Sequence, residues 1–420
     1  MFKNKILIII VVLLCFSAVS VVNAEETVLR YWTFSDFGTG DLLALQQVFI
    51  DEFLKDHPGY RVEVSAMGDD ELLSSLTTAA MSGTMPDLFV NTTRNGALFV
   101  SIDAMINIYD LWMAKPEEYR ANFDPATVAV MTPEDNTMWA LPYTGFSQFM
   151  YRNLDVLEAA GIDPNEEISD MEVWADHMKK ISEAGFYGTY SYHTDWWNFL
   201  SIYSSFAEKS DWGIDFSQNI SLLNPEKLVK TVEFLKKIAP YSTQLKRGEQ
   251  GAIDLFTTNK LAYYPDGPWA DIAFRKVEGL NYDFALIPGG TSSQHGGVGG
   301  LEMLCVGNTD NWEVAWELAS YLVDTPQMAR WAEIDARYLG NMTAMKTAAD
   351  RGDKMLAITE KATPYIIYNQ TPFFEKAYPG NYYAPLLEYL DMAMNDEVDL
   401  LDGAIEARDL MTESIKEEYE

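Results

Sequence analysis

The chain has 420 residues, of which 48% are hydrophobic, 63 are Asp or Glu and 30 are Lys or Arg, so its formal net charge at pH 7 is −33. This hydrophobic content is normal for a folded protein, and the length exceeds what one core usually serves, so two lobes are expected and disorder is not. The acidic balance repels phosphate backbones and anionic lipid, which excludes nucleic acid as a natural partner.

The amino terminus has the pattern of a secretory signal. Lys3 and Lys5 precede an apolar run at 6–14, and the small residues of 22–24 lie at the spacing that a signal peptidase reads. The run is short for a spanning helix. Because Leu14 occupies a position where a lipidation signal needs a small residue, Cys15 is not expected to carry a lipid. We predict a signal peptide at residues 1–24 and a free periplasmic protein.

Strand and helix patterns then alternate along the chain. Strands are predicted at 29–32, 60–64, 86–90, 149–151, 284–288 and 301–306, and helices at 42–53, 72–80, 154–160, 169–181, 225–238, 312–323 and from Pro385 to the end. Ser169 and Glu172 form a predicted capping box, and Asn224 is the predicted cap of the helix that follows it. The strand–helix–strand order at the start predicts a parallel sheet with helices on both faces, hence an α/β fold.

The segment 248–269 is predicted to place the large aromatic ring of Trp269 at a sharp reversal of the chain. A short helix pattern and an apolar run at 261–264 are followed by Pro-Asp-Gly-Pro at 265–268, which we expect to continue neither element. Pro268 suits the first position of a new helix, so Trp269 is predicted to open one. An indole there combines an apolar plate with a hydrogen-bond donor and is placed to contact a ligand.

No motif for catalysis, a metal or a cofactor is found. Cys305 is the only cysteine after the signal and lies in an apolar strand pattern, so it is predicted to be a buried, inert thiol. The four histidines lack ligand spacing, no Gly-x-Ser-x-Gly occurs, and the glycine run 296–300 precedes a strand rather than a helix. We therefore expect no catalytic residue, no metal and no cofactor.

Several short blocks occur in an order that points to a known family. They are the first strand and helix, 81–87 (MSGTMPD), 140–143 (ALPY), 151–153 (YRN), 159–161 (AAG), 266–269 (DGPW), 286–290 (LIPGG) and 312–317 (WEVAWE). Together they resemble the extracellular solute-binding proteins of family 1, the maltose- and oligosaccharide-binding group of ABC importers. The segment 337–344, where relatives often supply a cleft loop, matches only loosely, and no ligand contact is assigned to it.

The resemblance implies a two-lobed periplasmic-binding-protein fold, with a hinge of crossover strands and the ligand in the cleft between the lobes. The first lobe would comprise 25–143 and 298–325, and the second 144–297 and 326–420. Ligands of open α/β sheets bind beyond the carboxyl ends of strands, which agrees with such a cleft.

Sugar recognition combines aromatic plates with short polar side chains and exposed backbone groups. The candidates at strand ends and loops are Trp32, Asp36, Asp69, Asn91, Tyr143, Trp196, Trp197, Asp266 and Trp269, with Gly299 and Gly300 allowing the backbone to approach the ligand. Core packing for Trp32 and helix capping for Asp69 are equal alternatives. Of Trp196 and Trp197, one ring is expected in the cleft and one in the core.

These expectations describe a monomeric periplasmic receptor that binds a sugar or short oligosaccharide and delivers it to the permease of an ABC transporter. The alternative is a secreted acidic glycoside hydrolase, which would need two carboxylates held at a set separation across the scissile bond. Among 63 acidic residues, scattered surface charge is the simpler interpretation.

Overall fold

The computed structural model describes residues 26–38, 40–92, 96–133, 135–168, 170–290, 295–335, 337–365, 367–368 and 382–419. The expected signal peptide at 1–24 lies outside these ranges. Within them, every helix is too short or too polar to cross a bilayer.

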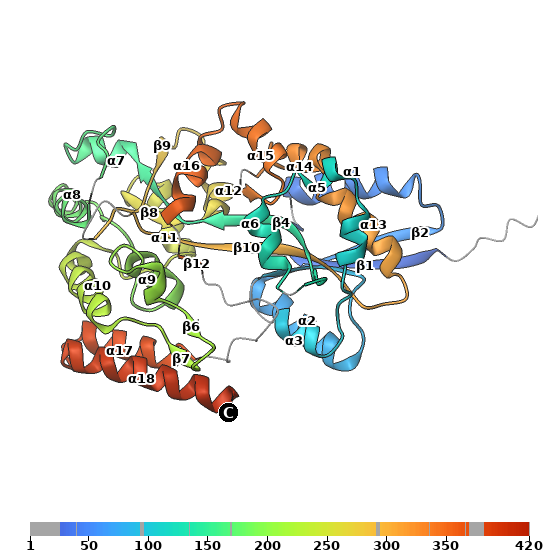
Figure 1. Cartoon of the computed structure of the whole chain (residues 1–420). Helices are drawn as coiled ribbons and strands as arrows, with labels where there is room; N and C mark the ends of the chain where they lie inside the picture. Colours follow the sequence, from blue (N-terminus) through green and yellow to red (C-terminus); the bar gives the residue numbers. More distant parts are fainter. Residues whose placement is uncertain are drawn as a thin grey trace, which may run out of the picture.

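The first lobe is built on the parallel sheet predicted from the sequence (Figure 1). It contains β1 (Thr27–Phe34), α1 (Gly40–Leu54), β2 (Tyr60–Met67), α2 (Asp69–Ser82), β3 (Leu88–Thr92), α3 (Gly96–Ser101), α4 (Tyr109–Ala114), α5 (Glu117–Arg120) and α6 (Pro125–Met131). β1 lies between β2 and β3 and pairs with both in parallel. β2 is the edge strand and alternates between half-buried and exposed residues, whereas β3 is buried along nearly its whole length, as expected for an interior strand.

Two long strands connect the lobes. β4 (Leu141–Ser147) and β10 (Val298–Val306) pair with each other antiparallel, and β10 also pairs antiparallel with β3, so the sheet order is β11-β4-β10-β3-β1-β2. Figure 1 shows both strands running from one lobe toward the other. The pairing register of β10 with β4 shifts between Glu302 and Met303, an irregularity of the β-bulge type.

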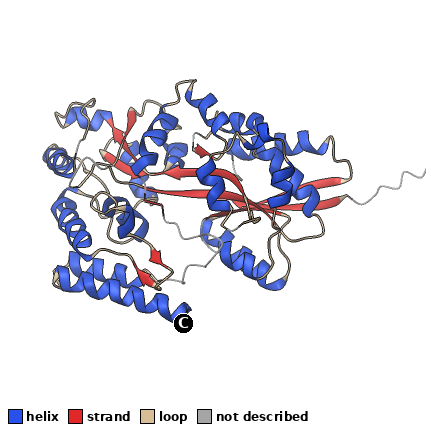
Figure 2. Ribbon diagram, viewed as in Figure 1, coloured by secondary structure: helices blue, strands red, loops and turns tan. Residues whose placement is uncertain are grey.

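The second lobe is mostly helical around a small sheet (Figure 2). Its elements are β5 (Phe149–Asn153), α7 (Leu154–Ala159), α8 (Met171–Glu183), α9 (Trp196–Tyr203), η1 (Lys209–Asp211), β6 (Ile214–Asp215), β7 (Ile220–Ser221), α10 (Pro225–Ile238), η2 (Ala239–Tyr241), α11 (Gln250–Thr257), β8 (Tyr263–Asp266), η3 (Pro268–Ala270), α12 (Asp271–Phe274) and β9 (Tyr282–Ala285). β5 lies between β8 and β9 and pairs antiparallel with both. α10 packs on the carboxyl-terminal pair of helices.

The remaining elements are α13 (Trp312–Leu322), α14 (Thr325–Trp331), β11 (Tyr338–Leu339), α15 (Met342–Ala349), α16 (Lys354–Ala362), η4 (Thr363–Tyr365), β12 (Ile367–Tyr368), α17 (Ala384–Met394) and α18 (Leu400–Tyr419). α14 contacts α1 and α13, and β11 pairs with β4. The ring of Trp331 packs against Phe37 and Tyr143. The chain from 326 to 349 therefore packs beside first-lobe elements, whereas the sequence boundary at 326 assigned it to the second lobe.

Two local expectations differ from the structure. The cap of α8 is Asp170, whose carboxylate accepts from the Val173 amide at 2.9 Å, whereas Ser169, the predicted cap, lies outside the described residues. Pro265 and Asp266 continue strand β8. Pro265 is tolerated there because β8 is an edge strand, paired only with β5 in the three-stranded sheet. The predicted cap Asn224 is confirmed, since its side chain accepts from the amides of Glu226 and Lys227.

Candidate functional site

A cavity of 440 Å³ lies between the two lobes. The first lobe reaches it from the loop after β1, the start of α2 and the end of β3, and the second lobe reaches it from the start of α9, from η3 and from the residue before α17. Its lining consists of Phe34, Ser35, Asp36, Asp69, Asp70, Thr92, Phe146, Asp195, Trp196, Trp197, Arg247, Trp269, Glu302, Arg337 and Tyr383. Most of these positions are the carboxyl ends of strands or the amino ends of helices, where an α/β fold presents backbone and side chains to a ligand.

Five aromatic rings form the second-lobe side of this cavity. Phe146 meets Trp197 and Trp269 edge to face, with ring centroids 5.7 and 5.1 Å apart. Trp196 lies 5.0 Å from Tyr383 and contacts Trp197 at 5.5 Å. Because each ring supports the next, the indoles are held in place before any ligand arrives, which reduces the ordering cost of binding.

Two glycines make room for these rings. A Cβ on Gly300, which lies opposite Phe146 in the β4–β10 ladder, would come within 2.6 Å of the phenyl ring. A Cβ on Gly267 would come within 2.3 Å of the Trp269 indole. Both distances are too short for a real contact, so the small residue at each site lets an aromatic plate fold back over the backbone.

A buried arginine organises the floor of the cavity. Arg337 is 1% exposed, and its guanidinium donates to Asp335 at 2.6 Å, to Glu302 at 3.4 Å and to Asp36 at 3.4 Å. The same guanidinium lies 4.6 Å over the ring of Phe37. Arg337 therefore connects the loop after β1 to the crossover strand β10. Arg337 begins the segment 337–344, to which the sequence analysis assigned no ligand contact, and yet it lines the cavity.

Glu302 is the buried carboxyl group of this network. Burial raises its pKa to about 7, although the charge of Arg337 and a hydrogen bond from the Thr144 hydroxyl oppose the shift. The carboxyl group thus joins β10 to β4, the two strands that cross between the lobes.

Arg247 forms a second cationic position at the other end of the cavity. Its guanidinium donates to Asn198 at 2.6 Å and to Asp266 at 3.2 Å, and it lies 5.9 Å from the Trp269 ring. Burial raises the pKa of Asp266, while Arg247 and hydrogen bonds from the Gly267 amide and Trp269 lower it. Asp266 therefore lies beneath the lining and holds Arg247 and Trp269 in position.

The structure brings together some of the candidates from the sequence. Asp36, Asp69, Trp196, Trp197 and Trp269 all line the cavity. Both rings of the Trp196–Trp197 pair face it, whereas the sequence assigned one of them to the core.

The other candidates lie elsewhere. Tyr143 and Asn91 are each 2% exposed and lie off the cavity lining, and Trp32 packs partly buried against the first-lobe core. Gly299 pairs with Ser147 and Tyr368 within the sheet, and Gly300 accommodates Phe146, so neither lines the cavity with its backbone.

Several lining residues were missed by the sequence analysis. Asp195 offered a signal, because it is the cap of α9 and accepts from the Trp197 amide at 2.9 Å. Phe146, Arg247 and Glu302 offered none that distinguishes them from other core or surface residues, whereas Tyr383 could be expected to flank the cleft but is of a type that more often packs between helices. Their placement depends on how distant segments pack.

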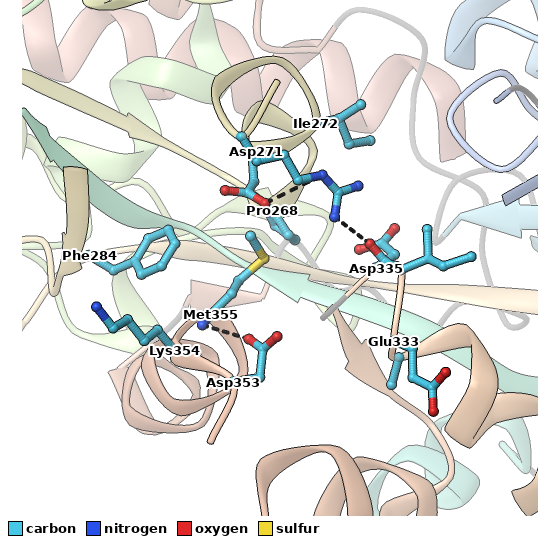
Figure 3. Close-up of a pocket in the computed structure, with 12 residues that line it drawn as sticks. Pro268, Asp271, Ile272, Phe284, Glu333, Asp335, Asp353, Lys354 and Met355 are labelled. Atoms are coloured by element: carbon cyan, nitrogen blue, oxygen red, sulfur yellow. Dashed lines mark hydrogen bonds and ion pairs between the residues drawn. The ribbon is translucent and has the colours of Figure 1, made fainter. Parts of the chain in front are cut away.

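A smaller cavity of 200 Å³ lies between α12 and the segment that joins α14 to α16 (Figure 3). In it Arg275 pairs with Asp271 and donates to the carbonyl of Ile334 at 2.6 Å. Asp335 lines this cavity and also binds Arg337, so the two cavities share one wall. Its lining includes one aromatic ring, Phe284, whereas the larger cavity has several, so it is a poorer candidate for a ligand that stacks on aromatic rings.

Comparison with known proteins agrees with this geometry. A profile described as bacterial extracellular solute-binding protein matches residues 49–362, which is most of the chain. The chain belongs to the bacterial extracellular solute-binding proteins. Membership of this family implies a periplasmic or extracellular location. A putative binding protein of Brucella abortus strain 2308 is 24% identical over 289 residues, covering 67% of this chain and 69% of that protein.

Solved structures show the same fold. An ABC transporter solute-binding protein of Thermotoga lettingae bound with α-D-tagatose superposes with a TM-score of 0.77 at 18% identity, covering 93% of this chain and 100% of that one. The maltotriose-binding protein of Thermus thermophilus gives 0.75 at 17% identity, with coverage of 92% and 100%. This solute-binding protein therefore has the two-lobed fold expected from its sequence.

Proposed function

We propose that this solute-binding protein captures a sugar or short oligosaccharide in the 440 Å³ cavity and delivers it to the permease of an ABC transporter from the periplasm. The observation that supports this most is the wall of aromatic rings facing carboxylates from the other lobe. Flat apolar rings suit the C–H faces of a sugar, and carboxylates accept hydrogen bonds from its hydroxyls.

Binding is expected to close the lobes, because only the closed form gives the ligand contacts from both sides. The first experiment is a thermal-shift screen of the mature protein against a carbohydrate panel, since a ligand at one hundred times its Kd adds about 2.7 kcal/mol to stability. Small-angle scattering with and without a saturating hit then measures closure. An unchanged radius of gyration would argue against the flytrap mechanism.

Trp269 is the plate whose removal should weaken binding most. If a ligand covers about 100 Å² of its apolar surface, ~25 cal/mol/Å² gives roughly 2.5 kcal/mol, or nearly a hundredfold in Kd. Calorimetry of Trp269→Ala should therefore show affinity reduced by one to two orders of magnitude. Trp312→Ala is the matched control, because Trp312 starts α13 away from the cavity.

A glycoside hydrolase would also hold acids in a cleft, and Glu302 has the raised pKa of a general acid. However, Glu302 is only 6% exposed and its carboxyl group is engaged by Arg337 and Thr144, which favours a receptor. Incubation with the ligand distinguishes the two functions: a hydrolase releases new reducing ends, and a receptor returns the ligand intact.

A further inference from the structure

The charges that line the cleft are unevenly balanced. Its lining contains five carboxyl side chains, Asp36, Asp69, Asp70, Asp195 and Glu302, and two guanidinium groups, Arg247 and Arg337. An anionic sugar, such as a uronic acid or a sugar phosphate, would therefore enter a repulsive field.

The two arginines do not offset this excess, because carboxylates beneath the cavity already engage them. Arg337 binds Asp335, a residue 5% exposed that lies behind the lining, at 2.6 Å. Arg247 binds Asp266, which is 2% exposed, at 3.2 Å. Arg337 also binds two of the lining carboxyl groups, Asp36 and Glu302, each at 3.4 Å. The carboxyl groups in and beneath the lining therefore outnumber the two guanidinium groups.

The aromatic wall is compatible with a cationic ligand as well as with a neutral sugar, and Arg247 already lies 5.9 Å from the Trp269 ring. Trp196, Trp197 and Trp269 surround one cavity together with Phe146 and Tyr383. The faces of aromatic rings carry partial negative charge, and clustered tryptophans are the preferred surface for an organic cation. A neutral sugar would use the apolar character of these rings, whereas an ammonium group would use their charge distribution as well.

Hydrogen-bonding capacity adds a third argument. An ionised carboxylate only accepts hydrogen bonds, so a lining dominated by carboxylates needs a ligand rich in donors. A protonated amine offers three donors and a compensating charge, and its hydrogen bonds to carboxylates are stronger than those of a hydroxyl group.

We propose that the ligand is a saccharide that carries a protonated amino group, held in the cleft by the indole wall and by the carboxylates that line the cavity, Asp195 among them. This inference rests on the proposed sugar-binding function. It adds the charge of the ligand, which that function leaves open.

The experiment compares ligands that share one disaccharide scaffold and differ in the group at C2, which is charged in one of them. Calorimetry of the mature protein uses the β-1,4-linked disaccharide of glucosamine, its N-acetylated form and cellobiose, which share one linkage and ring geometry. The aminated sugar is expected to bind at least about tenfold more tightly than either neutral one, a gap of roughly 1.4 kcal/mol. This advantage should shrink when the salt concentration rises, because ion pairing is screened.

A variant locates the effect in the cleft. Asp195→Asn keeps an N-cap residue at the start of α9, so the helix is retained while one charge is lost. It should reduce the affinity for the aminated sugar more than the affinity for the neutral sugars. Asp176→Asn removes the same charge from the exposed face of α8 and should leave the preference unchanged.

The possible outcomes separate this inference from the proposed function. Equal or tighter binding of the neutral disaccharides, with or without a salt effect, overturns the amino-sugar inference and leaves the sugar receptor standing. If no saccharide of either kind binds or stabilises the protein, the sugar-binding function fails and this inference fails with it. Preference for the aminated sugar that persists unchanged in Asp195→Asn and at high salt would also overturn it.

Discussion

Glu302 couples the stability of the fold to pH through its place on the floor of the cleft. Its pKa rises from 4.5 to about 7 because burial disfavours the ionised form. This difference corresponds to about 3 kcal/mol between the two protonation states. The folded protein holds the proton more tightly than the unfolded chain, so the contribution of Glu302 is full below pH 4.5 and is lost as the pH rises to about 7.

Replacing Glu302 by Gln removes this titration while keeping the shape of the side chain. The free energy of unfolding of each protein is measured by urea titration at pH 5 and pH 8. Between these values wild type should lose about 2 kcal/mol relative to Glu302→Gln, since most of the titration falls in this interval. The comparison with the variant cancels the other carboxylates, which titrate equally in both proteins.

Glu278→Gln provides the matched control, because Glu278 is exposed in the turn after α12. Its pH dependence should parallel that of wild type. Parallel curves for wild type and Glu302→Gln would refute the reasoning, because they would mean that Glu302 has the same proton affinity in the folded and unfolded chains.

Three further outcomes are expected. Gly300→Ala places a Cβ 2.6 Å from the Phe146 ring. Calorimetry should show the ligand affinity reduced about tenfold, and denaturation should show a loss of about 1 to 3 kcal/mol in the free energy of unfolding. Unchanged values would mean that the ring moves without consequence. Asp87→Ala removes a buried carboxylate that accepts hydrogen bonds from the Arg30 amide at 2.7 Å and the Thr309 hydroxyl at 2.6 Å. Urea denaturation should show a loss of about 3 kcal/mol in the free energy of unfolding. A loss within about 0.5 kcal/mol, the size of an ordinary surface substitution, would contradict this account. Cys305 is 0% exposed and burial raises its pKa, so a thiol reagent should label it only in denaturant; rapid labelling of the native protein would show that β10 opens.

The local structure of this chain was predictable where short-range physics decides it. Apolar periodicity indicated β1, α1, β2, α2 and β3 in order, and the side chain of Asn224 fixes the start of α10 through bonds to nearby amides. The turn before Trp269 was also foreseen, because proline and glycine restrict the backbone directly. Pro265 was misjudged, since its acceptance in β8 depends on that strand lying at the edge of a sheet.

The site itself was only partly predictable. Trp196, Trp197 and Trp269 were candidates because large aromatic rings in loops can stack on a sugar, and all three line the cavity. Tyr143 and Asp266 were candidates because they lie at predicted strand ends, yet both are 2% exposed. Whether a side chain at a strand end points to the cleft or to the core depends on the neighbouring segments.

By itself, the sequence determined the alternation of strands and helices, the acidic charge and the aromatic turn, because periodicity, composition and proline chemistry act over a few residues. Only the tertiary structure decided that Arg337 would meet Asp36, a residue 301 positions away, and that Phe146 would support the indoles of Trp197 and Trp269. Such contacts depend on how two lobes pack around crossing strands, and no local pattern specifies the distance between residues that only folding brings together.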